Sequence, residues 1–274
     1  MKIIRAFVAL STAALVGTLA VACSDPPKEP DDPYVVTSVP WRVPEHLAYV
    51  LLDDEQQETI GRGVLSVSEQ GGQWVLSQSF EDDDGNTDES VLLTEPETLR
   101  PVRSVRSLYD AGGDERRTVD AEYGVLDDGD YGVRIRQRVF DPASDDEPSS
   151  TRCNPLRVPE SSFDNDSSLF LWRTLPFEDG LEVQYTASIP NRRTTRIVTL
   201  VVREPERIET PAGTFDAWHV FILAEGQSHD AWFEVDAPHR MVKYDNDLQV
   251  FLLEGDADPP GDLLEPQGVS QSCE

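Results

Sequence analysis

Apolar and polar residues alternate along most of the chain between Tyr34 and Leu253. The clearest case is Leu181–Ile189 (LEVQYTASI), where every odd-numbered position is apolar and every even-numbered position is polar. A period of two is typical of a β-strand with one buried face and one solvated face. Comparable runs, each predicted as a strand, occur at Leu47–Leu52, Arg62–Val67, Gln73–Phe80, Glu89–Leu93, Val102–Tyr109, Arg117–Tyr123, Tyr131–Val139, Arg196–Arg203, Phe215–Leu223, Asp230–Val235, Arg240–Tyr244 and Leu248–Leu253.

Short turn signals separate these runs, among them Gly71-Gly72, Asp84-Gly85, Gly112-Gly113 and Asp128-Gly129. Tight turns between alternating runs indicate antiparallel hairpins. The sequence therefore predicts a mainly all-β fold, an antiparallel meander within a single domain over residues 34–254. A sheet of this length curls into a half-barrel or open barrel, or splits into a sandwich.

One segment, Ser161–Pro176 (SSFDNDSSLFLWRTLP), breaks the alternation and predicts one short helix. Asp164 or Asp166 can cap its N-terminus, and Pro176 ends it. The ordinary interpretation is a helix that plugs one end or the open side of the curved sheet. The sharper one is that Phe170 and Trp172 form a lid over an apolar cavity.

The N-terminus reads as an export signal. Residues 1–23 combine a basic start with an apolar run that ends in Leu19-Ala20-Val21-Ala22-Cys23, which resembles a bacterial lipobox with Cys23 as the lipidated residue. A plain secretory signal and an uncleaved membrane anchor are the alternatives. Residues 24–33 (SDPPKEPDDP) are rich in proline and acid, so they are expected to form an extended tether. Ser24 resembles outer-membrane sorting, which predicts a lipid-anchored envelope protein facing the periplasm. Residues 255–274 are expected to form an irregular tail.

The chain is strongly acidic, with 52 acidic against 23 basic residues and a formal net charge of −29. Such a balance argues against nucleic acid as a partner and against docking onto anionic lipid by charge. The acid is spread over turns rather than gathered in one block, which favours a solvated, self-repelling surface. Calcium binding by Glu81–Ser90 (EDDDGNTDES) is a weaker reading, because Gly85 does not match the EF-hand spacing.

Three cysteines are present. With Cys23 assigned to lipid, Cys153 and Cys273 remain as an even pair in an exported chain, which predicts a disulfide that pins the tail. Two cysteines this far apart, without a CxxC partner, lack the spacing of a zinc site.

Motifs that carry catalysis or cofactor binding are absent from the sequence: no nucleophile elbow, Walker loop, dinucleotide loop or HExxH occurs. His229-Asp230 with Asp236 and His239 could hold a metal, but solvated turn residues are the better interpretation. With 52 carboxylates, acidic pairs carry no information about a glycosidase site. We therefore expect a protein that is not an enzyme and that uses no cofactor or metal.

A family resemblance rests on the C-terminal half, Ser167–Asp245. A helix end containing Leu-Pro precedes two strands, a Glu-x-Pro-Ala-Gly-Thr-Phe turn (Glu209–Phe215) and a Trp-Phe-x-x-Asp stretch (Trp232–Asp236). This order resembles the bacterial envelope family known as domain of unknown function 3108. The usual Pro-Val of the next strand is replaced by Met241-Val242, and the usual Ser-Pro after Trp-Phe by Glu234-Val235.

The resemblance implies a curved sheet similar to the periplasmic lipoprotein carriers LolA and LolB, whose concave face can hold acyl chains. It implies no activity, because fold similarity does not transfer function. Aromatic side chains are the first candidates to line an apolar pocket on such a face. The candidates are Trp172, Tyr185, Trp218, Phe221 and Trp232.

Three functional hypotheses follow. The favoured one is a non-catalytic lipoprotein, held to the membrane through Cys23, that binds an apolar or amphipathic ligand such as a lipid, a lipidated protein or a glycan precursor. The second is a structural or assembly lipoprotein that binds another envelope protein through a sheet edge. A hydrolase is a distant third.

Overall fold

The structure is a computed structural model that describes residues 29–55, 57–113, 115–141, 147–261 and 263–269. Its strands form one sheet with the order β8-β7-β6-β5-β4-β3-β2-β1-β15-β14-β13-β12-β11-β10-β9. All pairings are antiparallel except that of β9 with β10. The strands are β1 (Glu45–Asp53), β2 (Thr59–Gln70), β3 (Gln73–Asp82), β4 (Thr87–Thr94), β5 (Pro101–Asp110), β6 (Glu115–Val125), β7 (Tyr131–Phe140), β8 (Ser150–Arg157), β9 (Phe163–Asp164), β10 (Glu182–Ile189), β11 (Thr194–Thr210), β12 (Gly213–Ala224), β13 (Gln227–Glu234), β14 (Met241–Asp245) and β15 (Gln249–Asp256).

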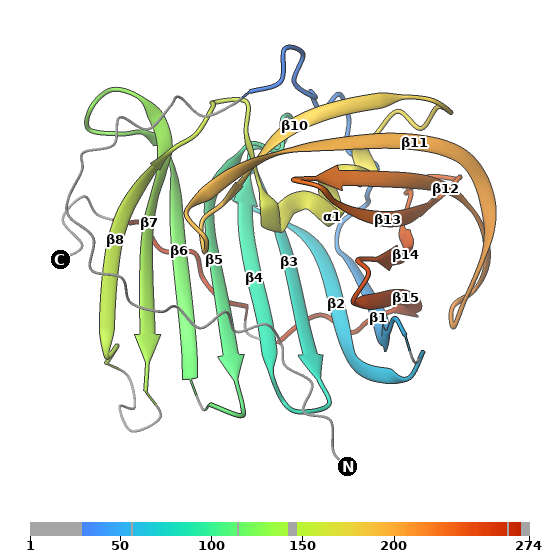
Figure 1. Cartoon of the computed structure of the whole chain (residues 1–274), viewed down its shortest axis with the longest axis horizontal. Helices are drawn as coiled ribbons and strands as arrows, with labels where there is room; N and C mark the ends of the chain where they lie inside the picture. The colour runs from blue at the N-terminus through green and yellow to red at the C-terminus, as the bar shows by residue number, and fades with distance from the viewer. Residues whose placement is uncertain (1–28, 56, 114, 142–146, 262, 270–274) are drawn as a thin grey trace.

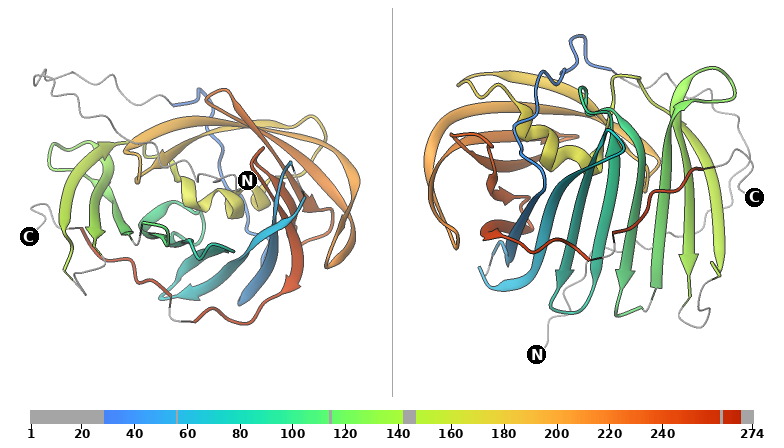
Figure 2. Two further views of the ribbon diagram at one scale, coloured as in Figure 1. Left: turned by 60° about the horizontal axis from the view of Figure 1, so that its bottom comes forward. Right: turned by 180° about the vertical axis from the view of Figure 1, so that it is seen from behind.

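The sheet curls but does not close, because β8 and β9 remain as its two edges. Its first and last long strands, β1 and β15, pair in the middle, so the sheet consists of an arm β1–β8 and an arm β9–β15. Figure 1 shows the second arm turning over the first, and Figure 2 shows the two arms curving around a central region, which we call the hollow. The predicted mainly β, half-barrel fold is thereby confirmed.

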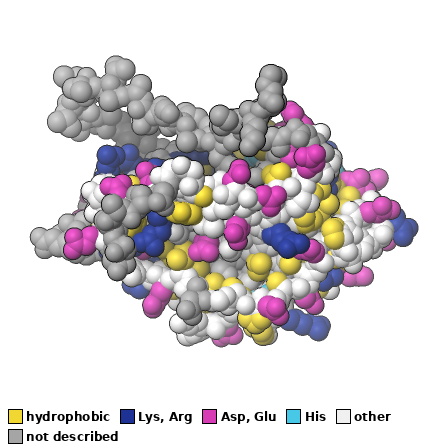
Figure 3. All heavy atoms as spheres, turned by 90° about the horizontal axis from the view of Figure 1, so that it is seen from below, with side chains coloured by type: hydrophobic (Ala, Val, Ile, Leu, Met, Phe, Trp, Pro, Cys, Tyr) yellow, Lys and Arg dark blue, Asp and Glu magenta, His cyan; other side chains and the backbone are white. Residues whose placement is uncertain are grey.

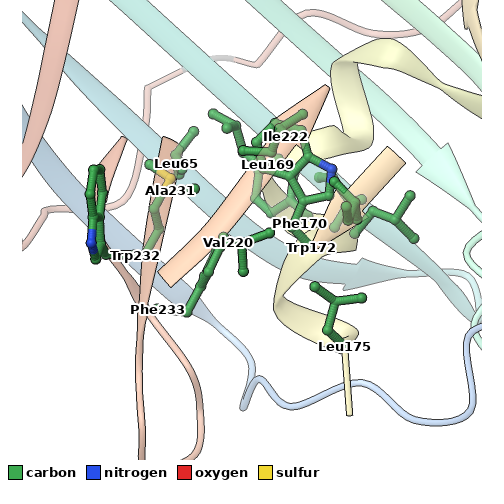
Figure 4. Close-up of a cluster of buried hydrophobic side chains, with 14 of the residues drawn as sticks. Leu65, Leu169, Phe170, Trp172, Leu175, Val220, Ile222, Ala231, Trp232 and Phe233 are labelled. Atoms are coloured by element: carbon green, nitrogen blue, oxygen red, sulfur yellow. The ribbon is translucent and has the colours of Figure 1, made fainter. Parts of the chain in front are cut away.

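A short helical segment occupies this hollow (Figure 2). It consists of η1 (Asn165–Ser167), α1 (Ser168–Leu171) and η2 (Trp172–Thr174), and we call these residues, 165–174, the plug. Asp164 caps its N-terminus by accepting a hydrogen bond from the Asp166 amide, as the sequence predicted. The leucine and aromatic side chains of the plug are buried against the second arm, and Figure 4 shows them facing Val220 and Ile222 of β12.

The main hydrophobic core lies between the plug and the concave face of the sheet. On β3 and β4 both faces are covered: Leu76 and Leu92 join the main core, whereas Val75 and Val91 belong to a second cluster on the outer face. Leu264 of the C-terminal tail packs against that cluster. Figure 2 shows the tail crossing the outside of the first arm. Burial on both faces explains why β4 reads as a continuous apolar run instead of an alternating one.

The structure moves both predicted boundaries of the β domain. Pro33 pairs with Gln184 and Pro30 is buried, so the chain already contacts the domain within the last five residues of the predicted tether. At the other end, β15 continues to Asp256 and shortens the predicted tail by two residues.

Candidate functional site

A cavity of about 160 Å³ lies beside the plug and is lined by residues of both arms. Its volume is close to that of an engineered protein cavity of ~150 Å³ that binds benzene. Most of the rest of the hollow is filled by the plug, whose Phe170 and Trp172 are 1% and 4% exposed. The cavity is lined by Gln78, Phe80, Asp88, Arg106, Asn165, Asp166, Ser168, Leu169, Trp172, Arg196, Val198, Ile222, Ala224, His229, Tyr244 and Phe251.

An aromatic wall forms one side of the cavity. Ring centroids are 5.3 Å apart for Phe80 and Phe251, 5.4 Å for Phe251 and Tyr244, and 5.9 Å for Tyr244 and Trp172. The Phe80 ring lies over Gly63 of β2, where a Cβ atom would come within 2.4 Å of it. The missing side chain at Gly63 therefore permits Phe80 to lean across β2 toward β15.

The opposite side is polar and holds the N-terminal end of the plug. Arg106 donates to both oxygens of Asp88, at 2.9 and 2.5 Å, and to Asp166 at 2.8 Å. Burial raises the pKa of Asp166 to about 7, against the lowering effect of Arg106, while the neighbouring Asp164 and Asp88 raise it further. These charged groups are thus already engaged with one another.

Asp164 holds the same end of the plug in place through hydrogen bonds of its side chain. Its carboxylate accepts hydrogen bonds from Ser104 (2.9 Å) and Tyr123 (2.7 Å), and the Tyr123 hydroxyl also contacts Ser188 at 2.8 Å. Burial raises the pKa of Asp164, and its hydrogen bonds oppose that rise. The network ties β5, β6, β9 and β10 together and positions the plug.

Arg196 and His229 line the cavity from the second arm, and the His229 ring lies 6.2 Å from the Tyr244 ring of the aromatic wall. Arg196 donates from Nη2 to the Asn165 side chain at 2.7 Å. Its Nε atom and the Nδ1 atom of His229 are buried and have no hydrogen-bond partner among the described residues. Burial, and next the positive charge of Arg196, lower the pKa of His229.

The five aromatic candidates from the sequence fall into two groups. Trp172 lines the cavity, and its indole donates to the Tyr185 hydroxyl at 3.0 Å. Tyr185 is completely buried behind it, and Trp218 stacks on Phe177 at 6.2 Å, outside the cavity.

Phe221 and Trp232 belong to the opposite face of the sheet. Arg203 covers the Phe221 ring at 4.6 Å, and Trp232 stacks on His219 at 4.9 Å. Figure 4 shows Trp232 apart from Phe233, which points toward the plug. Only one of the five candidates, Trp172, therefore lines this cavity.

Sequence reasoning missed the other aromatic and basic residues of the cavity. Phe80, Arg196, His229, Tyr244 and Phe251 come from five different strands. Alternation along each strand shows which residues share a face, but not which face is concave. The pairings Ile222 with His229 and Val198 with Ala224 place these lining residues side by side on β11–β13.

A second, more open hollow of about 560 Å³ lies beside the turn that begins β12. It is lined by Phe215 and Asp216, which end the turn that carries the family resemblance. Arg240 also lines it and donates to both oxygens of Glu234 at 2.8 and 2.6 Å. Thr210 pairs with Gly213 across the turn, so this stretch is a hairpin. Asp216 and His219, three residues apart on β12, lie on opposite faces.

Several other sequence hypotheses can be located. His229, Asp230, Asp236 and His239 are not brought together: Asp230 contacts His219 at 2.5 Å, and His239 Nδ1 lies 2.8 Å from the Glu234 carbonyl. In the part of the chain that the structure describes, no group of three or more His, Cys, Asp or Glu residues is placed to hold a metal ion. The acidic run from Glu81 is a turn in which Asp82 accepts from the backbone amides of Asp84 and Asn86.

The predicted lipidation and disulfide stay predictions. Cys23 and Cys273 lie outside the described residues, and Cys153 lies on the edge strand β8. The helices within the described ranges are all too short or too polar to cross a bilayer. Acidic side chains are scattered over the surface seen in Figure 3, in line with the distribution along the sequence.

Three solved structures are similar in outline. A "beta-barrel-like" protein of domain of unknown function DUF1849 from Brucella abortus shares 12% identity with a TM-score of 0.39, over 82% of this chain and 100% of that one. A "putative lipoprotein" from Parabacteroides distasonis shares 11% identity with a TM-score of 0.30, over 83% and 100%. A "putative exported protein" with a YmcC-like fold from Bacteroides fragilis gives 11% and 0.30, over 81% and 100%.

No curated protein matches the chain. The family comparison gives a match over residues 55–250, which spans both arms of the sheet and the plug. The match extends well beyond the C-terminal half on which the resemblance in the sequence rests. This chain therefore belongs to the DUF3108 family of proteins of unknown function.

Proposed function

We propose that the protein is a non-catalytic, lipid-anchored envelope protein that binds a small apolar or amphipathic ligand in the concave cavity. The observation that carries the proposal is a cavity with an aromatic wall on one side and polar groups on the other. Ligand sites are typically concave and apolar, with a few polar groups that orient the ligand.

The size of the cavity limits the ligand. A volume of about 160 Å³ holds a body the size of one aromatic ring. A complete acyl chain, as expected from the likeness to lipoprotein carriers, does not fit while the plug is in place. The ligand is therefore a small molecule or the end of a larger one.

A binding role also agrees with how the carboxylates are used. Asp88 and Asp166 both bind Arg106, and Asp164 binds Ser104 and Tyr123. These groups hold the plug and do not converge on an open position where a substrate atom could react.

Calorimetric titration with benzyl alcohol tests the binding role. The full chain in lipid nanodiscs is compared with Ala224→Met, which fills the cavity, and with Ala217→Met as the matched control. Both alanines are on β12 and at most 1% exposed, but only Ala224 lines the cavity. We expect saturable heat for wild type and Ala217→Met and none for Ala224→Met. Equal heat from all three proteins, as for partition into lipid, would refute the proposal.

The anchor is tested separately. Cells fed a labelled fatty acid should incorporate it into the wild-type protein and not into Cys23→Ala, and only the wild type should fractionate with the outer membrane. Label in the Cys23→Ala protein would disprove lipidation at this residue.

A further inference from the structure

The lining of the cavity contains two buried nitrogen atoms that are not used by the fold. They are Nε of Arg196 and Nδ1 of His229, neither of which has a hydrogen-bond partner among the described residues. A buried polar atom without a partner destabilises the folded state, and a ligand that binds it removes that cost. Both side chains line the same cavity, and the charge of Arg196 acts directly on the His229 ring.

The two arginines of the cavity differ in how their charge is balanced. Arg106 is bound by two carboxylates, those of Asp88 and Asp166. The hydrogen bond of Arg196 goes to the neutral amide oxygen of Asn165, and within the described ranges no carboxylate is in ion-pair distance of Arg196. Among the described residues, Arg196 is therefore the arginine of this cavity that has no ion-pair partner.

We propose that the cavity binds a carboxylic acid with a small aromatic or aliphatic body, its carboxylate held by Arg196 Nε and His229 Nδ1. This inference rests on the proposed function and names its ligand class. Arg196 Nε–H donates to one carboxylate oxygen, and His229 Nδ1 donates to the other once the ring takes up a second proton beside the bound carboxylate, because its other nitrogen is engaged by the Asn246 backbone. The body of the ligand lies against Tyr244 and Phe251.

A single negative charge fits better than two. Asp88 and Asp166 line the same cavity and would repel the second charge of a phosphate group. One Nη2 N–H of Arg196 is already bound to Asn165, so part of the guanidinium fork is occupied. A doubly charged phosphate ester should consequently bind more weakly than a carboxylate of the same body.

Calorimetry with three probes that share one ring tests the inference: benzoate, benzyl alcohol and phenyl phosphate. Wild-type full chain in nanodiscs should bind benzoate at least about tenfold more tightly than benzyl alcohol, because charge-assisted hydrogen bonds are the stronger ones. Phenyl phosphate should bind more weakly than benzoate. In Arg196→Gln the ratio of benzoate to benzyl alcohol affinity should fall to near one.

Arg192→Gln is the matched control, since it removes the same charge from the exposed β10–β11 turn and should keep the wild-type ratio. If Arg196→Gln unfolds through loss of its bond to Asn165, His229→Gln supplies the same comparison. Equal wild-type affinities for benzoate and benzyl alcohol would overturn the carboxylate inference and leave the binding function standing. Failure of both to bind would overturn the binding function itself, and tighter binding of phenyl phosphate would overturn the single-charge requirement.

Discussion

Arg173, at the C-terminal end of the plug, supports the sharpest prediction about stability. Its side chain is 2% exposed and donates to both oxygens of Glu45, at 2.5 and 3.0 Å. It also donates to the carbonyls of His239 and Pro238, at 3.1 Å each, and its guanidinium lies 5.6 Å from the Trp41 ring. One residue thus ties the plug to β1 and to the β13–β14 turn.

Replacing Arg173 with alanine leaves Glu45, whose side chain is 12% exposed, without its partner, and two carbonyls without a donor. Breaking a buried ion pair from one side costs about 3–5 kcal/mol. For a domain of this size, each kcal/mol lowers the melting temperature by about 2–4 °C. We therefore expect Arg173→Ala to melt roughly 6–20 °C below the wild type.

Thermal unfolding followed by circular dichroism measures this shift, with Arg192→Ala as the exposed control that changes stability by less than about 0.5 kcal/mol. The double variant Arg173→Met/Glu45→Leu should recover part of the loss, because it leaves no unpaired charge. If Arg173→Ala melts within 2 °C of the wild type, the ion pair does not anchor the plug and the reasoning fails.

Three further predictions concern pH and two glycines. Burial raises the pKa of Asp166 from an unfolded value of about 3.9 to about 7, so the folded state binds the proton more tightly and stability falls as pH rises from about 4 to 7. Asp166→Asn should reduce the change in melting temperature between pH 5 and pH 8. An unchanged pH dependence would show that Asp166 is not the group that titrates. Gly63→Ala places a methyl group 2.4 Å from the Phe80 ring and should cost about 1–3 kcal/mol in urea unfolding, unlike Gly261→Ala, which meets nothing within 4 Å. Gly213→Val, at φ +137°, should lower the free energy of unfolding by a similar amount, measured as a lower urea midpoint. An unchanged midpoint would show that the turn does not need glycine.

Local pattern was sufficient to predict most of the sheet. The strictly alternating run LEVQYTASI became β10, and its odd-numbered residues from Tyr185 to Ile189 are buried. The even-numbered Thr186 and Ser188 are buried as well, so the alternation predicted the strand correctly, but the solvated second face was wrong for this half of β10. The N-cap of the plug at Asp164 was predictable because capping is a contact between near neighbours in sequence.

Two missed parts of the sheet involve proline, whereas the two-residue β9 (Phe163–Asp164), which lies in the segment predicted as a helix, does not. β8 contains Pro155 and lies at the open edge, where a strand pairs on one side only and a missing N–H is tolerated. β11 was predicted to stop at Arg203 but continues through Pro205 to Thr210, because a bulge between Arg203 and Pro205 absorbs the irregularity. Single-sequence reasoning treats proline as a stop and therefore ends strands too early.

The site depends on contacts that no local pattern contains. The rings of Phe80 and Phe251 are 5.3 Å apart although the residues are far apart in sequence, and Arg196 of β11 reaches Asn165 of the plug. The pairing of β1 with β15 brings Phe80 near Phe251, and the pairing of β10 with both β9 and β11 brings Asn165 near Arg196. Alternation along a strand does not show which of its faces is concave, so Trp232 was proposed for the cavity although it lies on the opposite face.

The plug is held by polar contacts at both ends and by apolar packing between them. At one end Asp166 binds Arg106, and at the other Arg173 binds Glu45. Apolar packing alone is non-directional and would accept several positions of so short a helix. The ion pairs select one position, and that position leaves the cavity open beside Trp172. If so, Arg173→Ala should speed amide hydrogen exchange of residues 165–174 more than that of β5–β7, and equal acceleration throughout would mean that the plug and the sheet unfold as one unit.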